Sequence, residues 1–287
     1  MIYLSEFEFP SYDEEYAFRL DKVKRTCYNT MYPFFVLSAH GLGRLDFAPV
    51  TIFYGGNGSG KTTALNVIAQ RLGLVRRAAY NRSDFFGDYV KMCSHRLAAP
   101  LPAGSCMIAS DDVFDYMLDV RALNDGIDAR REELFGEYLQ NKYAQFRMTS
   151  LDDYDRLKAV CDARSRTQSK YVRQRLAGNV RERSNGESAF LYFEERIGEG
   201  TLCLLDEPEN SLSPERQNEL KEFLEQSARY FDCQLVIATH SPFLLSMNGA
   251  KIYDFDETPV DVKRWTELKN VRAYYEFFKW RQREFEI

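Results

Sequence analysis

The chain has 287 residues, of which 45% are hydrophobic and 28% charged, and its formal net charge is −5. This length fits one large α/β domain with an insertion, and the ordinary composition excludes a wholly disordered chain. The negative net charge argues against a protein that coats nucleic acid with its whole surface, although a local basic patch is compatible with it.

Two apolar runs in the amino-terminal part predict buried strands. They are residues 33–39 (PFFVLSA) and residues 50–54 (VTIFY), and the second run ends directly at glycines. Apolar side chains then recur at helical spacing over residues 62–72. The sequence therefore predicts a glycine-rich loop that connects a strand to a helix.

This loop, residues 55–62, reads GGNGSGKT and fits the pattern G-x-x-x-x-G-K-[ST] completely. In such a loop the glycines let backbone N–H groups converge on phosphate oxygens, Lys61 reaches the β and γ phosphates, and the Thr62 hydroxyl binds Mg²⁺. An incidental glycine-rich turn is the alternative, and the flanking strand and helix argue against it. The candidate nucleotide-binding residues here are Gly55, Gly56, Asn57, Gly58, Ser59, Gly60, Lys61, Thr62 and Thr63.

Residues 111–183 show long charged stretches with a repeating apolar stripe, which predicts a helical subdomain. Residues 124–126 (NDG) predict a break within it. The simplest interpretation of its charges is a solvated helix surface. The chain accordingly divides into a core made of residues 1–110 and 184–287, with residues 111–183 inserted.

Strand patterns return at residues 201–205 (TLCLL) and 234–238 (QLVIA), with an amphipathic helix over about residues 214–230 between them. Apolar runs separated by such a helix predict a parallel βαβ unit. Residues 251–255 predict one more strand, and residues 271–284 a closing helix. The fold class is therefore α/β, with a mainly parallel central sheet.

The strand at residues 201–205 leads into an acidic pair, Asp206 and Glu207, and Pro208 stops it. Asp206 can hold the metal ion, and Glu207 can orient and polarise the attacking water. Such a pair is common after strands and weak evidence alone. Downstream of a phosphate loop, it indicates the catalytic partner of that loop.

The strand at residues 234–238 leads into Thr239, His240, Ser241 and Pro242. A lone histidine is more often a structural residue. However, parallel neighbouring strands end on the same side of a sheet, so we expect His240 near Glu207. There it can sense the γ-phosphate by hydrogen bonding.

These motifs together resemble ATPases of the ABC superfamily, in the soluble branch that includes the SMC, recombination-repair and OLD-type proteins. The resemblance covers the phosphate loop, the Walker B strand ending in LLDEPE, residues 210–213 as a D-loop, and the switch ATHSPFLL. The short stand-alone bacterial ATPases of the AAA family are nearest, because they also continue through a strand like KIYDFDE to a final helix. The resemblance implies a P-loop NTPase fold with an ABC-type head, ATP and Mg²⁺ as cofactors, Thr62 and Asp206 at the metal, and catalytic roles for Glu207 and His240.

Residues 184–188 (SNGES) match the S-x-G-E signature of that branch. By the resemblance, Ser184, Gly186 and Glu187 of one subunit would close over ATP bound to the phosphate loop of another, in a homodimer that forms on ATP binding. The dipole of the following helix would help bind this anion. The alternative is an Asn-Gly turn that caps an ordinary helix.

Two parts of the family pattern cannot be assigned. Residues 79–88, where a Q-loop is expected, contain no glutamine, and Gln70 lies too close to the phosphate loop. Tyr28 and Tyr32 are the candidates for a side chain that stacks on adenine.

Three other classes of protein share part of the pattern. A kinase has the phosphate loop but would not explain SNGES, LLDEPE and ATHS together. A transporter nucleotide-binding subunit would carry LSGGQ and a recognisable Q-loop, which are lacking. An ATP-dependent clamp or regulatory subunit with little turnover stays open, although Glu207 argues for turnover.

The partner is less well indicated. The basic residues Arg164, Arg166, Lys170, Arg173, Arg175, Arg181 and Arg183 accompany one acid, Glu182. They could track the phosphates of nucleic acid. Equally, they could neutralise nucleotide phosphates at a dimer interface or pair with acidic patches. The sequence contains no nuclease or other effector motif, so we expect an unknown effector protein to act with the chain.

No apolar run approaches the length that spans a bilayer, and the first residues are acidic where a secretory signal would be basic and then apolar. We therefore expect a cytoplasmic protein without membrane contact. The six cysteines are scattered without a C-x-x-C spacing, and the chain has three histidines. This pattern favours neither a structural zinc site nor a disulfide framework.

Overall fold

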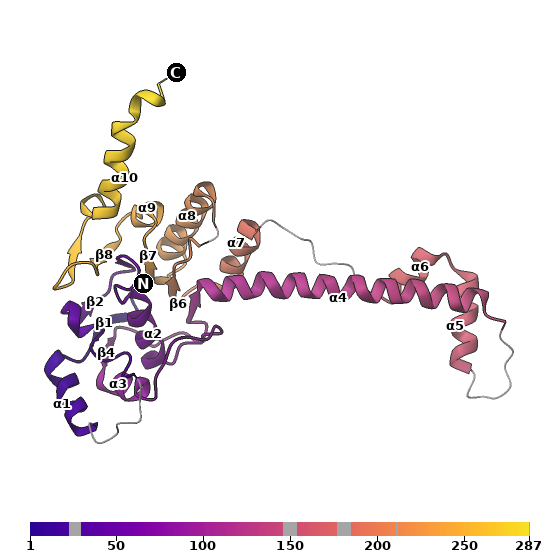
Figure 1. Cartoon of the computed structure of the whole chain (residues 1–287), viewed down its shortest axis with the longest axis horizontal. Coiled ribbons are helices and arrows are strands. Elements are labelled where there is room, and N and C mark those ends of the chain that lie inside the picture. Colours follow the sequence, from indigo (N-terminus) through magenta and orange to yellow (C-terminus); the bar gives the residue numbers. More distant parts are fainter. Residues whose placement is uncertain (23–29, 146–153, 177–184, 211, 287) are drawn as a thin grey trace. The chain divides into compact units, whose positions relative to one another are not determined.

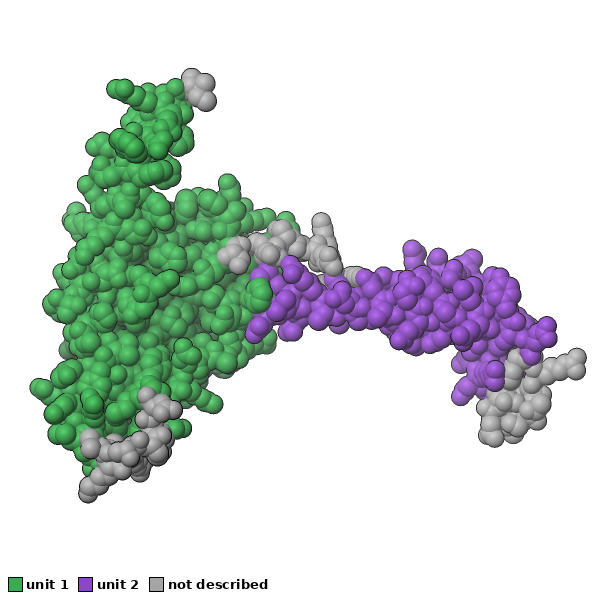
Figure 2. Space-filling model, viewed as in Figure 1, with its two compact units in different colours: residues 1–114, 185–287 green, residues 115–184 purple. Residues whose placement is uncertain are grey.

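A computed structural model of the chain describes residues 1–22, 30–145, 154–176, 185–210 and 212–286. The chain forms two compact units (Figure 2). Unit 1 contains residues 1–114 and 185–287, and unit 2 contains residues 115–184.

A six-stranded sheet forms the centre of unit 1 (Figure 1), with the strand order β5-β6-β7-β3-β8-β9. All neighbouring strands run parallel except β9, which pairs antiparallel with β8. Every residue of β3, β6 and β7 is buried, as expected for strands covered on both faces. The predicted α/β class with a mainly parallel sheet is confirmed. The strands are β3 (Val50–Tyr54), β5 (Cys106–Ala109), β6 (Leu202–Asp206), β7 (Gln234–Thr239), β8 (Lys251–Asp254) and β9 (Asp261–Lys263).

Helices connect these strands. The connection from β6 to β7 is α8, which begins after Ser213, whose hydroxyl accepts a hydrogen bond from the amide of Arg216. Helix α10 carries several aromatic side chains that are about half exposed or more. The helices of unit 1 are α1 (Tyr12–Lys22), α2 (Lys61–Leu72), α3 (Phe86–Met92), α7 (Asn185–Arg196), α8 (Pro214–Tyr230), α9 (Pro242–Leu245) and α10 (Lys269–Trp280).

A second, antiparallel sheet has the order β2-β1-β4 and was not predicted. Its strands are β1 (Leu4–Glu8), β2 (Arg44–Asp46) and β4 (Ser94–Leu97). Gln234 of β7 ties it to the central sheet, because the amides of Tyr3 and Leu4 donate to Gln234 Oε1, both at 2.8 Å.

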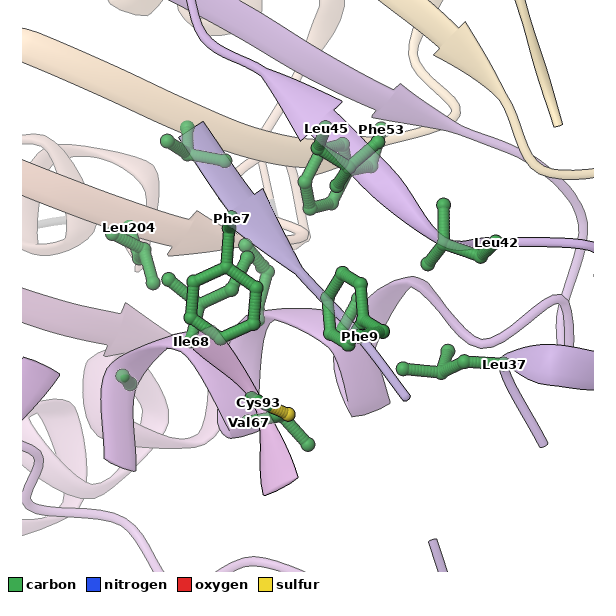
Figure 3. Close-up of a cluster of buried hydrophobic side chains, with 14 of the residues drawn as sticks. Phe7, Phe9, Leu37, Leu42, Leu45, Phe53, Val67, Ile68, Cys93 and Leu204 are labelled. Carbon is green, nitrogen blue, oxygen red and sulfur yellow. The ribbon is translucent and has the colours of Figure 1, made fainter. Parts of the chain in front are cut away.

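One hydrophobic cluster includes side chains of both sheets and α2 (Figure 3). Phe7 of β1, Leu45 of β2, Phe53 of β3, Ile68 of α2 and Leu204 of β6 are all fully or almost fully buried. Burial of each such side chain contributes about 1.5–3 kcal/mol relative to its exposure. This cluster fixes the strands whose ends carry the candidate site.

The predicted strand at residues 33–39 is wrong. The segment forms turns and a short 3₁₀ helix, Ser38–His40, and Phe35 adopts φ +63°. Its apolar residues Phe34 and Leu37 are buried, but its backbone is satisfied locally and by a side chain. The carboxylate of Glu15 accepts from the Phe35 amide and, at 3.0 Å, from the Ser38 hydroxyl. The segment is apolar because some of its side chains are buried, and its backbone does not pair in a sheet.

Unit 2 is helical. It contains most of α4 (Ser110–Tyr143), with α5 (Tyr154–Ser165) and α6 (Gln168–Arg173). The predicted break at residues 124–126 is wrong, because α4 continues through them. A glycine inside a helix costs only about 1 kcal/mol relative to alanine, and Asn124 is buried. None of the described helices is long and apolar enough to cross a membrane.

Candidate nucleotide-binding site

The phosphate loop lies between β3 and α2, as predicted. Gly58 and Gly60 have φ values of +83° and +92°, in the left-handed region that favours glycine. A Cβ at Gly60 would also lie 3.0 Å from Leu37 Cδ2. Glycine is therefore required where the loop bends into the helix.

Lys61 is held inside this loop. Its Nζ donates to the carbonyl oxygens of Gly55 at 2.7 Å and Gly56 at 2.9 Å. Burial lowers the pKa of Lys61, while the nearby carboxylates of Glu207 and Asp206 act in the opposite direction. A cation so placed can bind a phosphate that enters the loop.

Asp206 comes from the end of β6 and meets the phosphate loop directly. The Thr62 hydroxyl donates to Asp206 Oδ1 at 2.9 Å. Burial raises the pKa of Asp206 to about 6, because a carboxylate that is 7% exposed has lost most of its hydration. The oxygen atoms of a buried carboxylate and a hydroxyl are suitable ligands for Mg²⁺. The charge of this ion would stabilise the ionised form of Asp206.

Glu207 follows Asp206 and turns out of the sheet. Its φ is +48°, an uncommon value for a residue other than glycine, and its amide donates to the Ala238 carbonyl at 2.9 Å. Asn210 Nδ2 donates to Glu207 Oε2 at 3.1 Å. Glu207 also lines a cavity of roughly 500 Å³ together with Tyr32, Val36 and residues 57–63.

His240 follows β7, the strand beside β6, and reaches Glu207 as predicted. His240 Nδ1 lies 4.0 Å from Glu207 Oε1. Its side chain is 45% exposed, so the ring borders solvent on one side. The parallel register of β6 and β7 brings these two side chains together.

Two further residues contact the site, and a third lies near it; none was singled out in the sequence. Glu209 binds the segment after β7, and Asp256 Oδ1 accepts from the Gly56 amide at 2.8 Å. The charge of Arg76 opposes, in small part, the effect of burial on the pKa of Asp206. Glu209 lies in LLDEPE, and Asp256 follows β8, which neighbours β3. The rule that parallel strands end at one edge could have indicated Asp256.

Of the two tyrosine candidates for the adenine, Tyr32 borders the cavity. Its hydroxyl donates to Thr63 Oγ1 at 3.0 Å. Tyr28 lies outside the described residues. Stacking on adenine therefore stays a prediction, with Tyr32 as its carrier.

The predicted signature is only partly described. Ser184 lies outside the described residues, and Gly186 and Glu187 lie in the first turn of α7. Glu187 Oε1 is 3.5 Å from Arg216 Nη2 of α8. Among the described residues that line the phosphate-loop cavity, none belongs to α7.

A comparison with protein families matches residues 179–246 to the family described as "AAA domain, putative AbiEii toxin, Type IV TA system". The matched segment contains the predicted signature residues, β6 and β7. It supports the predicted resemblance to ATPases of the AAA family. No curated protein matches the chain.

Several solved structures are similar to the chain. The SMC head domain from Pyrococcus furiosus, with an extended coiled coil and bound to the C-terminal domain of ScpA, is 12% identical over 98% of this chain and 100% of that one, with a TM-score of 0.44. The SMC head domain from Thermotoga maritima is 11% identical over 91% and 98%, with a TM-score of 0.38. The ATP-binding cassette MJ0796, a post-hydrolysis dimer with ADP and Pi, is 12% identical over 78% and 90%, with a TM-score of 0.36.

Proposed function

We propose that the chain binds ATP with Mg²⁺ in the phosphate-loop cavity, hydrolyses it, and uses the cycle as a conformational switch for a partner. The observation that carries this proposal is the hydrogen bond of 2.9 Å between Thr62 and Asp206, beside a cavity that Glu207 lines. It joins the two predicted motifs in one place, although 144 residues separate them in the sequence.

In this proposal each group has one task. The loop amides, the amino end of α2 and Lys61 bind the phosphates. Thr62 and Asp206 hold Mg²⁺, which neutralises charge on the β and γ phosphates when it is bound. Glu207 orients the attacking water and accepts a proton from it. His240, which lies beside Glu207, forms a hydrogen bond with the γ-phosphate.

The proposal includes a homodimer that forms on ATP binding. Ser184, Gly186 and Glu187 of one copy would cap the γ-phosphate held by the other copy. In one copy Glu187 lies against Arg216 of α8, at 3.5 Å. Residues 1–110 and 184–287 would form the ATPase core around the insertion, and the cytoplasmic location stays a prediction.

The nucleic-acid partner predicted from residues 164–183 has less support. Arg166 and Arg175 both pair with Asp162, at 3.5 Å and 3.0 Å. Arg164 Nη2 donates to the Ala144 carbonyl at 2.6 Å. Arg181 and Arg183 lie outside the described residues. Because three of these arginines already have partners within unit 2, we favour an effector protein as the partner.

Replacing Lys61 with alanine tests the binding step. The loss of charge-assisted hydrogen bonds to phosphate, worth about 1.5–3 kcal/mol, should weaken ATP binding by about 10- to 100-fold. Isothermal titration calorimetry measures this affinity. Lys91→Ala, at an exposed lysine of α3, serves as the matched control. An unchanged dissociation constant for Lys61→Ala would show that Lys61 does not contribute to ATP binding.

A further inference from the structure

Glu209 is a buried carboxylate that connects the two turns of the site. Its side chain is 5% exposed, and three groups of the turn after β7 donate to its Oε1. They are the Thr239 hydroxyl at 2.5 Å, the His240 amide at 3.1 Å and the Ser241 amide at 3.2 Å. Burying a carboxylate costs free energy. A residue that only packed at this position would therefore not need to carry a charge.

The same residue belongs to the turn that presents Glu207. Glu209 follows Glu207 by one proline, and its carbonyl accepts from the Leu212 amide at 3.0 Å. Its side chain therefore links the backbone that carries Glu207 to the backbone that carries His240. The His240 ring is also close, with Nδ1 3.7 Å from Glu209 Oε1.

Other contacts make this link stiff. The Ser241 hydroxyl donates to Gln217 Oε1 of α8 at 2.6 Å, and Asn270 Nδ2 of α10 donates to the His240 carbonyl at 3.4 Å. His240 is thus held on both sides of its peptide unit. Glu209 Oε2 is buried without a hydrogen-bond partner among the described residues. The position of this carboxylate consequently depends on the three donors at Oε1.

We propose that Glu209 is the positioning residue that sets the separation between Glu207 and His240, and so regulates when the histidine reaches the γ-phosphate. This inference rests on the proposed function of the site. Glu209 does not touch the nucleotide in this proposal. It acts through the backbone and ring of His240, so its effect on turnover must depend on that histidine.

Hydrogen exchange tests the positioning without any turnover. In Glu209→Ala the His240 amide loses its acceptor, so its exchange should speed up by about tenfold or more, while the amides of β3 stay protected. The Ser241 amide keeps the Thr239 hydroxyl oxygen as an acceptor at 3.0 Å, so its exchange should change less. Glu209→Gln retains an acceptor oxygen and should restore much of the protection. Glu225→Ala on α8, which removes an acceptor of the Asn248 amide, is the matched control. Unchanged exchange at the His240 amide in Glu209→Ala would overturn the proposal.

A double-mutant cycle then tests the route of the effect. Glu209→Ala should lower kcat about tenfold with ATP affinity unchanged, and should have almost no further effect in the His240→Ala background. Fully additive losses would show that Glu209 acts elsewhere and would overturn the proposal. If the unmodified chain hydrolyses no ATP, the proposed function fails, and the exchange experiment still decides whether Glu209 holds the turn.

Discussion

Replacing Glu207 with glutamine should leave ATP and Mg²⁺ bound and slow hydrolysis by about 10²- to 10⁴-fold, the range attributed to a general base. Glu207 lines the cavity of the phosphate loop, whereas in the proposed function Lys61 and Thr62 contact the phosphate and the metal. Glutamine has the same size and can still contact Asn210. It cannot accept a proton from the attacking water. The variant should therefore bind ATP normally but hydrolyse it slowly.

Phosphate release under saturating ATP measures turnover, and calorimetry measures the affinity. Glu219→Gln makes the same chemical change at an exposed position of α8, where Glu219 pairs with Arg216. This control should hydrolyse ATP at the normal rate. A normal rate for Glu207→Gln would mean that another carboxylate activates the water. If the unmodified chain bound ATP tightly without hydrolysing it, the chain would act as an ATP-dependent clamp and not as an enzyme.

The parts of the site that the sequence predicts are local. The loop between β3 and α2 needs glycines with positive φ and a lysine at fixed spacing, so residues 55–62 carry their own structure. The strands β6 and β7 are continuous apolar runs because helices cover the sheet on both faces. Their common direction then places Glu207 and His240 at one edge. Most of the geometry of the candidate site follows from these two facts.

The remaining features depend on contacts between distant segments. The sheet β2-β1-β4 joins residues near 4, 44 and 94, and its short strands have little signal of their own. Residues 33–39 are apolar because Phe34 and Leu37 are buried, and a buried turn has the same composition as a buried strand. The role of Glu209 becomes visible only when the turn after β7 lies against it.

Mixing two inactive variants should restore ATP hydrolysis if the signature acts on another copy. Lys61→Ala removes the phosphate contact, and Gly186→Asp places a negative charge in the first turn of α7, where the γ-phosphate of the other copy would bind. The first turn of a helix tolerates aspartate, so the fold should persist. A dimer with one of each variant pairs an intact loop with an intact signature at one of its two sites.

Each variant alone should be nearly inactive, and an equal mixture should recover about a quarter of the normal activity, since random pairing gives mixed dimers half the time. A chain with both substitutions, mixed in equal amounts with the Gly186→Asp chain, forms no dimer with an intact site and is the matched control. Glu207→Gln with ATP and Mg²⁺ should sediment as a dimer, because the bound nucleotide stays intact between the copies. A monomer under these conditions, together with no recovery in the mixture, would contradict the homodimer and favour a complex in which a different protein completes the site.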